Sequence, residues 1–225
     1  MKSTNRLLSL DAFRGITIAA MILVNTPGSW AHVYAPLRHA EWHGWTPTDL
    51  IFPFFLFIVG VAMTFSIQTS IGVDFKSEIY KKVVKRSLIL FLLGVILNFY
   101  PFGIPFTSDG WSNFSFSSII DTFLDIRIMG VLQRIALCYL FTSIMIIHLT
   151  RRDQFYAAFG LLAVYAIAIL LYGHLTLEDN LARTIDLAIF FPANMYSVRG
   201  IPFDPEGLFS TIPAIVTTLS GVFVG

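Results

Sequence analysis

The chain has 225 residues, of which 56% are hydrophobic and only 13% are charged, and its net charge is +1 with a mean hydropathy of +0.73. Soluble domains carry about 25% charged residues, so this composition excludes a disordered chain and a freely soluble enzyme. The net charge gives no basic field for nucleic acid. Cys138 is the single cysteine, which excludes an internal disulfide. The composition is typical of a polytopic membrane protein.

Continuous apolar runs recur along the chain, and a helix that spans a bilayer needs about 20 such residues. The runs do not alternate as barrel strands do, and helices satisfy every backbone polar group in lipid. We therefore predict an all-α, polytopic transmembrane helical bundle that forms one transmembrane domain over residues 1–225. Six spans are expected, at residues Leu10–Asn25, Leu50–Ile67, Ser87–Tyr100, Ile128–Leu149, Phe155–Tyr172 and Leu208–Gly225.

The first apolar run is predicted to be a retained span rather than a cleaved signal peptide. It is longer than the core of a signal peptide, contains Asp11 and Arg14, and lacks a small-residue cleavage site. Asp11 and Arg14 are three residues apart and share a helix face, which favours a structural ion pair. The sixth run reaches the last residue of the sequence without a polar flank, so we expect a longer bundle with further spans.

Basic residues are distributed unequally between the segments that connect the spans. Nine lysines and arginines precede the first span or lie between spans two and three and between spans four and five, against four in the other three loops. The positive-inside rule therefore predicts a cytoplasmic N-terminus. The outer loops, about residues 26–48, 101–127 and 173–207, are longer than ordinary connections, so we expect them to be folded and functional.

Two neighbouring polar residues interrupt the fourth span. Arg134 lies about one turn inside it, beside Gln133, and a charge at the bilayer centre costs about 2.5 to 3.5 kcal/mol. The arginine either snorkels to the outer interface or faces a polar cavity, and Gln133 favours a surface that faces protein. Asn25 closes the first span, where it acts as a helix C-cap or contributes to a pocket.

The first outer loop is the segment richest in chemically active side chains. It holds His32, His39 and His43 together with Asp49. Zinc binding is disfavoured, because no cysteine or compact ligand pair accompanies the histidines. A histidine near a carboxylate suits general-base or nucleophilic catalysis. Asp49 also has a structural interpretation, since an acid at the start of the second span stabilises the helix.

Further polar residues fall at the same predicted end of the spans. Asp204 and Glu206 precede the sixth span, where they either cap that helix or face a pocket. A shared pocket at the outer ends explains all of these positions together, namely Asn25, His39, Asn98, Asp49, Arg134, Asp204 and Glu206.

The chain resembles the heparan-alpha-glucosaminide N-acetyltransferase family of integral membrane acetyltransferases, including its bacterial relatives. Four stretches carry the resemblance in order: RLLSLDAFRGITI, RHAEWHGWTPTDLIFPFFLFIVG, RIMGVLQRIALCY and FDPEGLFSTIPAIVTTLSGVFVG. The resemblance implies transfer of an acetyl group from cytosolic acetyl-CoA to an amino sugar or glycan amine on the outer face of the membrane. It places the active-site histidine on His39, the acid of that motif on Asp49 and the asparagine that ends the first span on Asn25. His43 stands where that motif has a neutral residue.

The expected mechanism follows from these positions. His39 either removes the amine proton or accepts the acetyl group first, and Asp49 orients its imidazole. Binding of acetyl-CoA is expected at Asn25, Arg134 and Gln133, and binding of the acceptor at Asp204 and Glu206. No metal is expected. Four cations between spans two and three set topology or bind the phosphates of acetyl-CoA: Lys81, Lys82, Lys85 and Arg86.

An alternative function from another class is a sugar or amino-sugar transporter without acyl-transfer chemistry, since polar residues within spans suit it equally well. A third hypothesis, a structural scaffold protein of the membrane, does not explain why Arg134 lies within a span or why the first outer loop is rich in aromatic residues. Consumption of acetyl-CoA separates the enzyme from the transporter. The resemblance to bacterial relatives implies the bacterial inner (plasma) membrane, with the lipid bilayer and an amino-sugar or glycan acceptor as partners. A homodimer is compatible with it, and no nucleic acid is expected.

Overall fold

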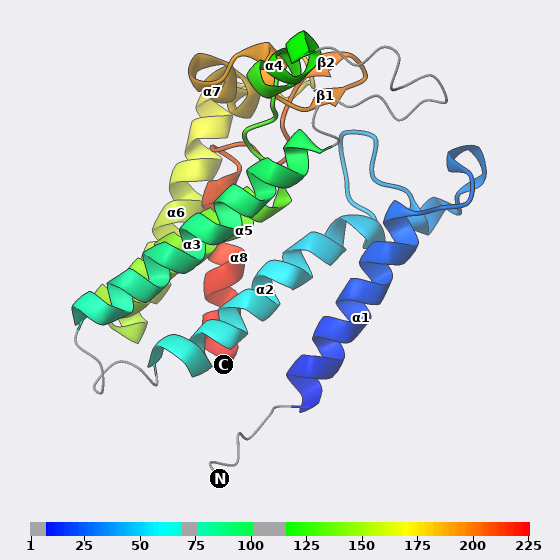
Figure 1. Cartoon of the computed structure of the whole chain (residues 1–225). Coiled ribbons are helices and arrows are strands. Elements are labelled where there is room, and N and C mark those ends of the chain that lie inside the picture. The colour runs from blue at the N-terminus through cyan, green and yellow to red at the C-terminus, as the bar shows by residue number, and fades with distance from the viewer. Residues whose placement is uncertain (1–7, 69–75, 101–115) are drawn as a thin grey trace.

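The computed structural model describes residues 8–68, 76–100 and 116–225, and it is mostly helical, as predicted. Sequence features in residues 1–7, 69–75 and 101–115 lie outside the described ranges. Six helices run lengthwise in alternating directions (Figure 1). They are α1 (Leu8–Asn25), α2 (Ile51–Met63), α3 (Lys76–Phe99), α5 (Val131–His148), α6 (Arg151–Tyr172) and α8 (Thr211–Val224).

Each predicted span corresponds to one of these helices, but only four have both the length and the composition to cross a membrane. These are the helical stretches Leu8–Asn25, Pro47–Ile67, Val131–His148 and Arg151–Tyr172. Helix α3 begins at Lys76 rather than at Ser87, so its first half is charged, and α8 is the shorter apolar helix Thr211–Val224. The bundle is therefore confirmed as helical, whereas six membrane spans stay a prediction.

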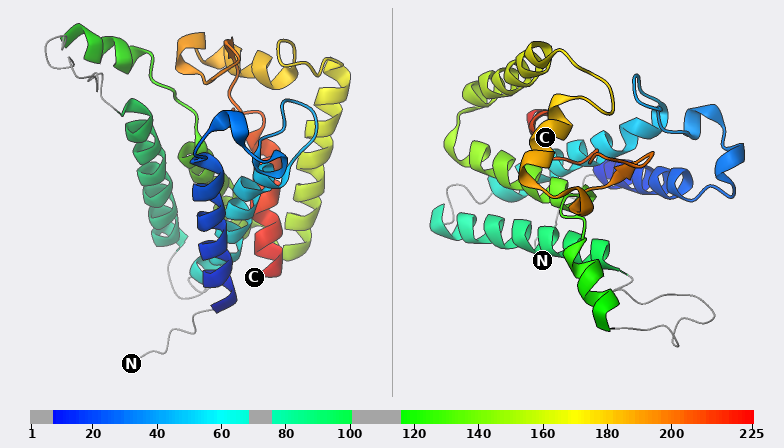
Figure 2. Two further views of the ribbon diagram at one scale, coloured as in Figure 1. Left: turned by 90° about the vertical axis from the view of Figure 1, so that its right-hand side faces the viewer. Right: turned by 90° about the horizontal axis from the view of Figure 1, so that it is seen from above.

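Short elements gather over one end of the bundle (Figures 1 and 2). They comprise α4 (Phe116–Leu124), α7 (Leu181–Ile189), a two-stranded hairpin of β1 (Ser197–Val198) and β2 (Ile201–Pro202), and the 3-10 turns Trp30–His32, Ala35–Leu37, Pro47–Leu50 and Pro192–Asn194. The hairpin turn places Arg199 and Gly200 at positive φ, which suits glycine at the second position. The described parts of the three predicted outer loops are thus folded, and they meet at the same end.

The core is built around the crossing of α2 and α8. A Cβ atom on Gly60 would lie 1.9 Å from the carbonyl oxygen of Thr218, and one on Gly221 would lie 2.1 Å from that of Phe57. The two backbones are therefore in direct contact, as small residues allow in membrane helix pairs. Leu56, Ile135, Cys138, Ile215 and Leu219 form the buried cluster that joins this crossing to α5.

Helix α1 lies at the edge of the bundle and packs on α2. The Phe13 ring contacts those of Phe54 and Phe57, with centroid separations of 5.6 and 6.4 Å. Arg14 and Asp11 form the predicted ion pair, at 3.9 Å. Because α1 leads into the first outer loop and α2 follows that loop, this pair of helices fixes both ends of the loop.

Candidate active site

His39 and Asp49 are joined directly. His39 Nδ1 lies 2.6 Å from Asp49 Oδ1, while Asp49 Oδ2 accepts hydrogen bonds from the backbone N–H groups of Ala40 (3.1 Å) and Thr46 (2.8 Å). The local sequence explains this fold, because Thr46 and Asp49 form a capping box around the turn that Pro47 begins. The carboxylate is therefore fixed by its own loop before it orients the histidine.

The pairing decides which atom of His39 is available for chemistry. A carboxylate that accepts from Nδ1–H holds the neutral ring in the tautomer that leaves a lone pair on Nε2. The His39 side chain is 60% exposed, whereas that of Asp49 is 27% exposed. The arrangement presents a basic, nucleophilic Nε2 to the space beside the loop.

That space is a cavity of about 500 Å³, a size typical of small-molecule sites, which we call the His39 cavity. Three aromatic residues form part of its wall, namely Trp42, Tyr196 and Phe203. The rings of Trp42 and Phe203 meet edge to face with centroids 5.1 Å apart, and Trp42 Nε1 donates to the carbonyl oxygen of Leu175 at 2.6 Å. The first outer loop is thereby attached to the third. The lining residues are His39, Ala40, Glu41, Trp42, Asp49, Arg127, Tyr196, Val198, Phe203, Pro205 and Glu206.

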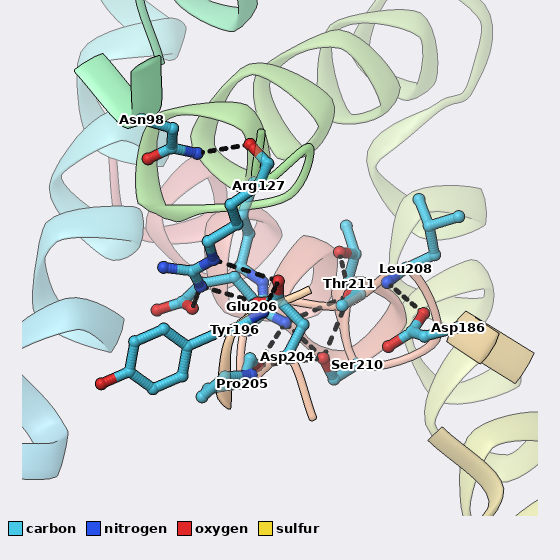
Figure 3. Close-up of polar contacts among 12 residues, drawn as sticks. Asn98, Arg127, Asp186, Tyr196, Asp204, Pro205, Glu206, Leu208, Ser210 and Thr211 are labelled. Carbon is cyan, nitrogen blue, oxygen red and sulfur yellow. Dashed lines mark hydrogen bonds and ion pairs between the residues drawn. The ribbon is translucent and has the colours of Figure 1, made fainter. Parts of the chain in front are cut away.

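Arg127 and Glu206 line the cavity beside Tyr196, and they form a cluster of one cation and two carboxylates together with Asp204 (Figure 3). Arg127 Nε and Nη2 donate to the two oxygens of Asp204 at 3.1 and 2.7 Å, and Nη2 also donates to Glu206 Oε2 at 2.5 Å. The guanidinium stacks over the ring of Tyr196, 4.8 Å from its centroid. The Asp204 side chain is only 1% exposed, whereas that of Glu206 is 18% exposed.

The Arg127 guanidinium is held in its charged form. Burial, the largest influence, lowers its pKa, but hydrogen bonds and charge attraction from Asp204 and Glu206 together outweigh it and raise the pKa. Asn98, at the end of α3, donates to the Arg127 carbonyl oxygen at 2.8 Å. One guanidinium between two carboxylates leaves a net negative charge on this wall, which suits a cationic ligand group.

Three predicted site residues lie elsewhere. Arg134 is buried, and its Nη2 donates to the carbonyl oxygens of Pro205 (2.8 Å) and Gly207 (3.2 Å) and to the Ser210 hydroxyl. Because the side chain is buried and its acceptors belong to the protein, Arg134 faces protein rather than the membrane interface.

Gln133 is 1% exposed and packs against α3, where a Cβ on Gly94 would lie 2.4 Å from its Oε1. Asn25 Nδ2 donates to the Met21 carbonyl oxygen in its own helix at 2.9 Å. Neither Asn25, Gln133 nor Arg134 is among the residues that line the His39 cavity.

The other histidines of the first loop are placed differently. His32 Nδ1 lies 3.4 Å from the Ser29 hydroxyl, and His43 packs against the Trp42 ring with centroids 6.3 Å apart. In the described part of the chain, no group of three or more His, Cys, Asp or Glu side chains is placed to hold a metal ion. His39 is therefore the histidine of this loop that faces the cavity with a carboxylate partner.

Comparison with known proteins identifies the family of the chain. The chain is 33% identical over 147 residues to the heparan-alpha-glucosaminide N-acetyltransferase of Mus musculus and 33% identical over 146 residues to that of Homo sapiens. These alignments cover 64% and 62% of this chain but only 19% of each relative. The family model for the catalytic part of heparan-alpha-glucosaminide N-acetyltransferase matches residues 6–225. The chain therefore belongs to the heparan-alpha-glucosaminide N-acetyltransferase catalytic family.

Proposed function

We propose that this chain is an integral membrane acetyltransferase that moves an acetyl group from acetyl-CoA to the amine of an amino sugar or glycan in the His39 cavity. The observation that carries the proposal is the His39–Asp49 pair, 2.6 Å apart, on the wall of a cavity with a net acidic, aromatic lining. Membership of an N-acetyltransferase family supports the reaction class.

The chemical step needs a base for the attacking amine. In direct transfer, the neutral amine nitrogen bonds to the acetyl carbon, His39 Nε2 takes one proton from that nitrogen, and the carbon–sulfur bond breaks. The imidazolium then returns its proton to the departing thiolate, and Asp49 stabilises the positive ring in between. If acetyl passes through the enzyme instead, Nε2 bonds to the acetyl carbon while the carbon–sulfur bond breaks and the coenzyme A thiolate departs. The acceptor amine then attacks the acetyl carbon, the bond from Nε2 to carbon breaks, and the amine proton passes to the freed Nε2.

Glu206 and Asp204 have different roles in this proposal. Glu206 faces the cavity and binds the ammonium or a hydroxyl group of the acceptor. Asp204 is buried and holds Arg127, so it positions the acidic wall without touching the acceptor. Trp42, Tyr196 and Phe203 supply apolar faces for a sugar ring.

The residues predicted to bind the donor also have different roles in this proposal. We propose that Arg134 and Gln133 are positioning residues, since Arg134 is engaged with the start of α8 and Gln133 with α3. Donor contact at Asn25 stays a prediction, because its recorded hydrogen bond is to its own helix. The donor approaches His39 from the cytoplasmic side of a bacterial inner membrane, and the acceptor approaches from the outside.

The test is transfer from labelled acetyl-CoA by the purified full-length protein in detergent. Glucosamine and galactosamine are the acceptors, and N-acetylglucosamine, which has no free amine, is the negative control. His39→Ala is expected to lower the transfer rate at least about 100-fold, because a general base usually contributes at least that factor to the rate. His32→Ala and His43→Ala are the matched controls and stay within a few-fold. Near-normal transfer by His39→Ala contradicts the assignment.

A further inference from the structure

A second cavity lies at the opposite end of the bundle, where α2 ends and α3 begins (Figure 1). Its volume is about 260 Å³, and we call it the Arg86 cavity. Helices α3 and α5 and the turn after α2 form its walls. The lining residues are Ser66, Ile67, Ile79, Lys82, Val83, Arg86 and Tyr139.

Of the four cations in the first part of α3, two line the Arg86 cavity and two do not. Lys82 and Arg86 are four residues apart, so they share one helix face, and both line the cavity. Lys81 points elsewhere and pairs with Glu78 at 2.8 Å, and Lys85 is not part of the lining. Both charged residues recorded in the lining are therefore positive.

Arg86 has the geometry of a ligand-binding guanidinium. Its guanidinium carbon lies over the ring of Tyr139, 5.8 Å from the centroid, which is within the range of a cation–π contact. Within the ranges that the structure describes, no carboxylate pairs with Arg86. Its planar fork of donors is thus available for an oxyanion, and phosphate matches that fork in a bidentate manner.

The wall facing Arg86 is formed by an irregular helix turn. Residues Thr64–Gln68 continue α2 as a π-helix, and this turn contributes Ser66 and Ile67 to the lining. Such turns widen a helix locally and occur frequently at functional sites. The remaining floor is apolar, with Ile79 and Val83, so the cavity combines a cationic rim with an apolar base.

We propose that the Arg86 cavity binds the phosphate of an amphipathic ligand, with Arg86 as the cation that contacts it. Two sources present this chemistry at a basic membrane surface, namely the headgroup of an anionic phospholipid and the phosphates of coenzyme A. The proposal rests on the cavity itself and holds whether or not His39 carries out acetyl transfer.

Two binding measurements on purified full-length protein test the proposal and identify the source. Coenzyme A is titrated into protein in neutral detergent, and retained phosphatidylglycerol is counted by native mass spectrometry after extraction from nanodiscs. Arg86→Gln is compared with Lys85→Gln, which removes the same charge from the same helix outside the cavity. Arg86→Lys serves as the conservative variant, and thermal unfolding verifies that each variant is folded.

For the true ligand, Arg86→Gln is expected to weaken binding at least about tenfold, the share of a charge-assisted hydrogen bond, with partial recovery in Arg86→Lys. Lys85→Gln is expected to stay within about twofold. An Arg86-dependent loss of coenzyme A binding identifies the coenzyme, and an Arg86-dependent loss of phosphatidylglycerol identifies the lipid. If Arg86→Gln and Lys85→Gln behave alike for both ligands, the proposal is overturned. Loss of acetyl transfer is not used as a readout, so failure here is distinct from failure at His39.

Discussion

Asp49 serves two neighbours at once, because one of its oxygens contacts His39 while the other accepts the backbone N–H groups of Ala40 and Thr46. An acid that only capped the turn would not need the first contact. Because each oxygen has its own partner, substitution can separate the two functions of Asp49. An amide in its place can still cap the turn but no longer orients His39.

Asp49→Asn is expected to reduce acetyl transfer by roughly 100- to 10,000-fold. The new amide oxygen still caps the turn, but an amide N–H facing Nδ1 stabilises the tautomer that carries its proton on Nε2. Steady-state rates on folded protein measure the effect. Glu41→Gln is the control, because Glu41 lines the same cavity but is 86% exposed and pairs with Arg199. Equal rates for Asp49→Asn and wild type contradict the orienting role.

Glu206→Gln and Asp204→Asn are expected to fail in different ways. Glu206 lines the cavity, so its amide raises the acceptor KM by about tenfold or more, and it costs less stability than Asp204→Asn because Arg127 keeps both hydrogen bonds to Asp204. Asp204 is buried against Arg127, and removing its charge leaves a half-buried cation short of a partner, which costs on the order of 3 kcal/mol of stability. Acceptor kinetics and thermal unfolding separate the two. The reverse pattern contradicts the assignment of Glu206 to the acceptor.

At the scale of helices, the contact between α2 and α8 sets the position of the site. Asp49 lies in the turn that begins α2, and Glu206 lies just before α8. Gly60 and Gly221 allow these two helices to touch backbone to backbone. The distance between the histidine loop and the acidic wall therefore depends on a crossing well away from both.

Gly221→Ala is expected to destabilise the protein by about 1–3 kcal/mol or more, because the added methyl group would lie 2.1 Å from the Phe57 carbonyl oxygen and backbone cannot move aside cheaply. Gly160→Ala is the matched control on α6, where nothing lies within 4 Å of the new atom. Alanine favours a helix more than glycine does, so the stability of the Gly160→Ala protein is expected to be unchanged or slightly higher than that of wild type. Thermal unfolding in detergent measures both, and equal stability of the two variants would show that the crossing adapts.

Helix α7 is tied to the start of α8 through a buried acid. Asp186 Oδ1 accepts from the Leu208 N–H at 2.9 Å, and the residue is fully buried (Figure 3). Burial raises the pKa of its carboxyl from 3.8 to about 6. The folded protein therefore holds this proton more tightly than the unfolded chain does. The corresponding stability is present below pH 3.8 and is lost as the pH rises through about 6.

Asp186→Asn, which is neutral at every pH, is expected to remove this dependence. The stability of the variant relative to wild type should rise between about pH 4 and pH 7, by on the order of 2–4 kcal/mol for a shift of this size. Thermal unfolding across that interval measures the difference. Glu178→Gln, an exposed acid of the same outer loop, is the control and should track wild type. A constant offset between Asp186→Asn and wild type contradicts the titration.

The long apolar helices could be predicted from the sequence, because a run of apolar side chains suits lipid and a helix pairs its backbone polar groups within the same run. The acidic wall was only partly predictable. The positions of Asp204 and Glu206 before a span point to a cap or a pocket, but nothing in the sequence singles out Arg127, whose partners lie 77 and 79 residues along the chain. No periodicity links residues so far apart. The loop contact between Trp42 and Leu175 was missed for the same reason.

For the whole molecule, the unequal distribution of basic residues predicts that the N-terminus is inside, and the alternation of the six helices then puts the His39 cavity outside. Glu178→Cys is expected to react with an impermeant thiol reagent added to intact cells, whereas Lys85→Cys reacts only after permeabilisation. The native Cys138 is fully buried and contributes no background. Labelling of Lys85→Cys but not Glu178→Cys in intact cells would reverse the orientation.

The crossing of α2 and α8 also bears on how the protein is assembled from its chain. The histidine loop and the acidic wall are brought together by a contact between helices, and the chain between them passes through α3, α5 and α6. The residues of that contact, on α2 and α8, lie on opposite sides of the short turn between α5 and α6 in the sequence. Two separately synthesised pieces divided at this turn therefore carry complementary surfaces, and co-insertion into one membrane is sufficient in principle to rebuild the cavity from both.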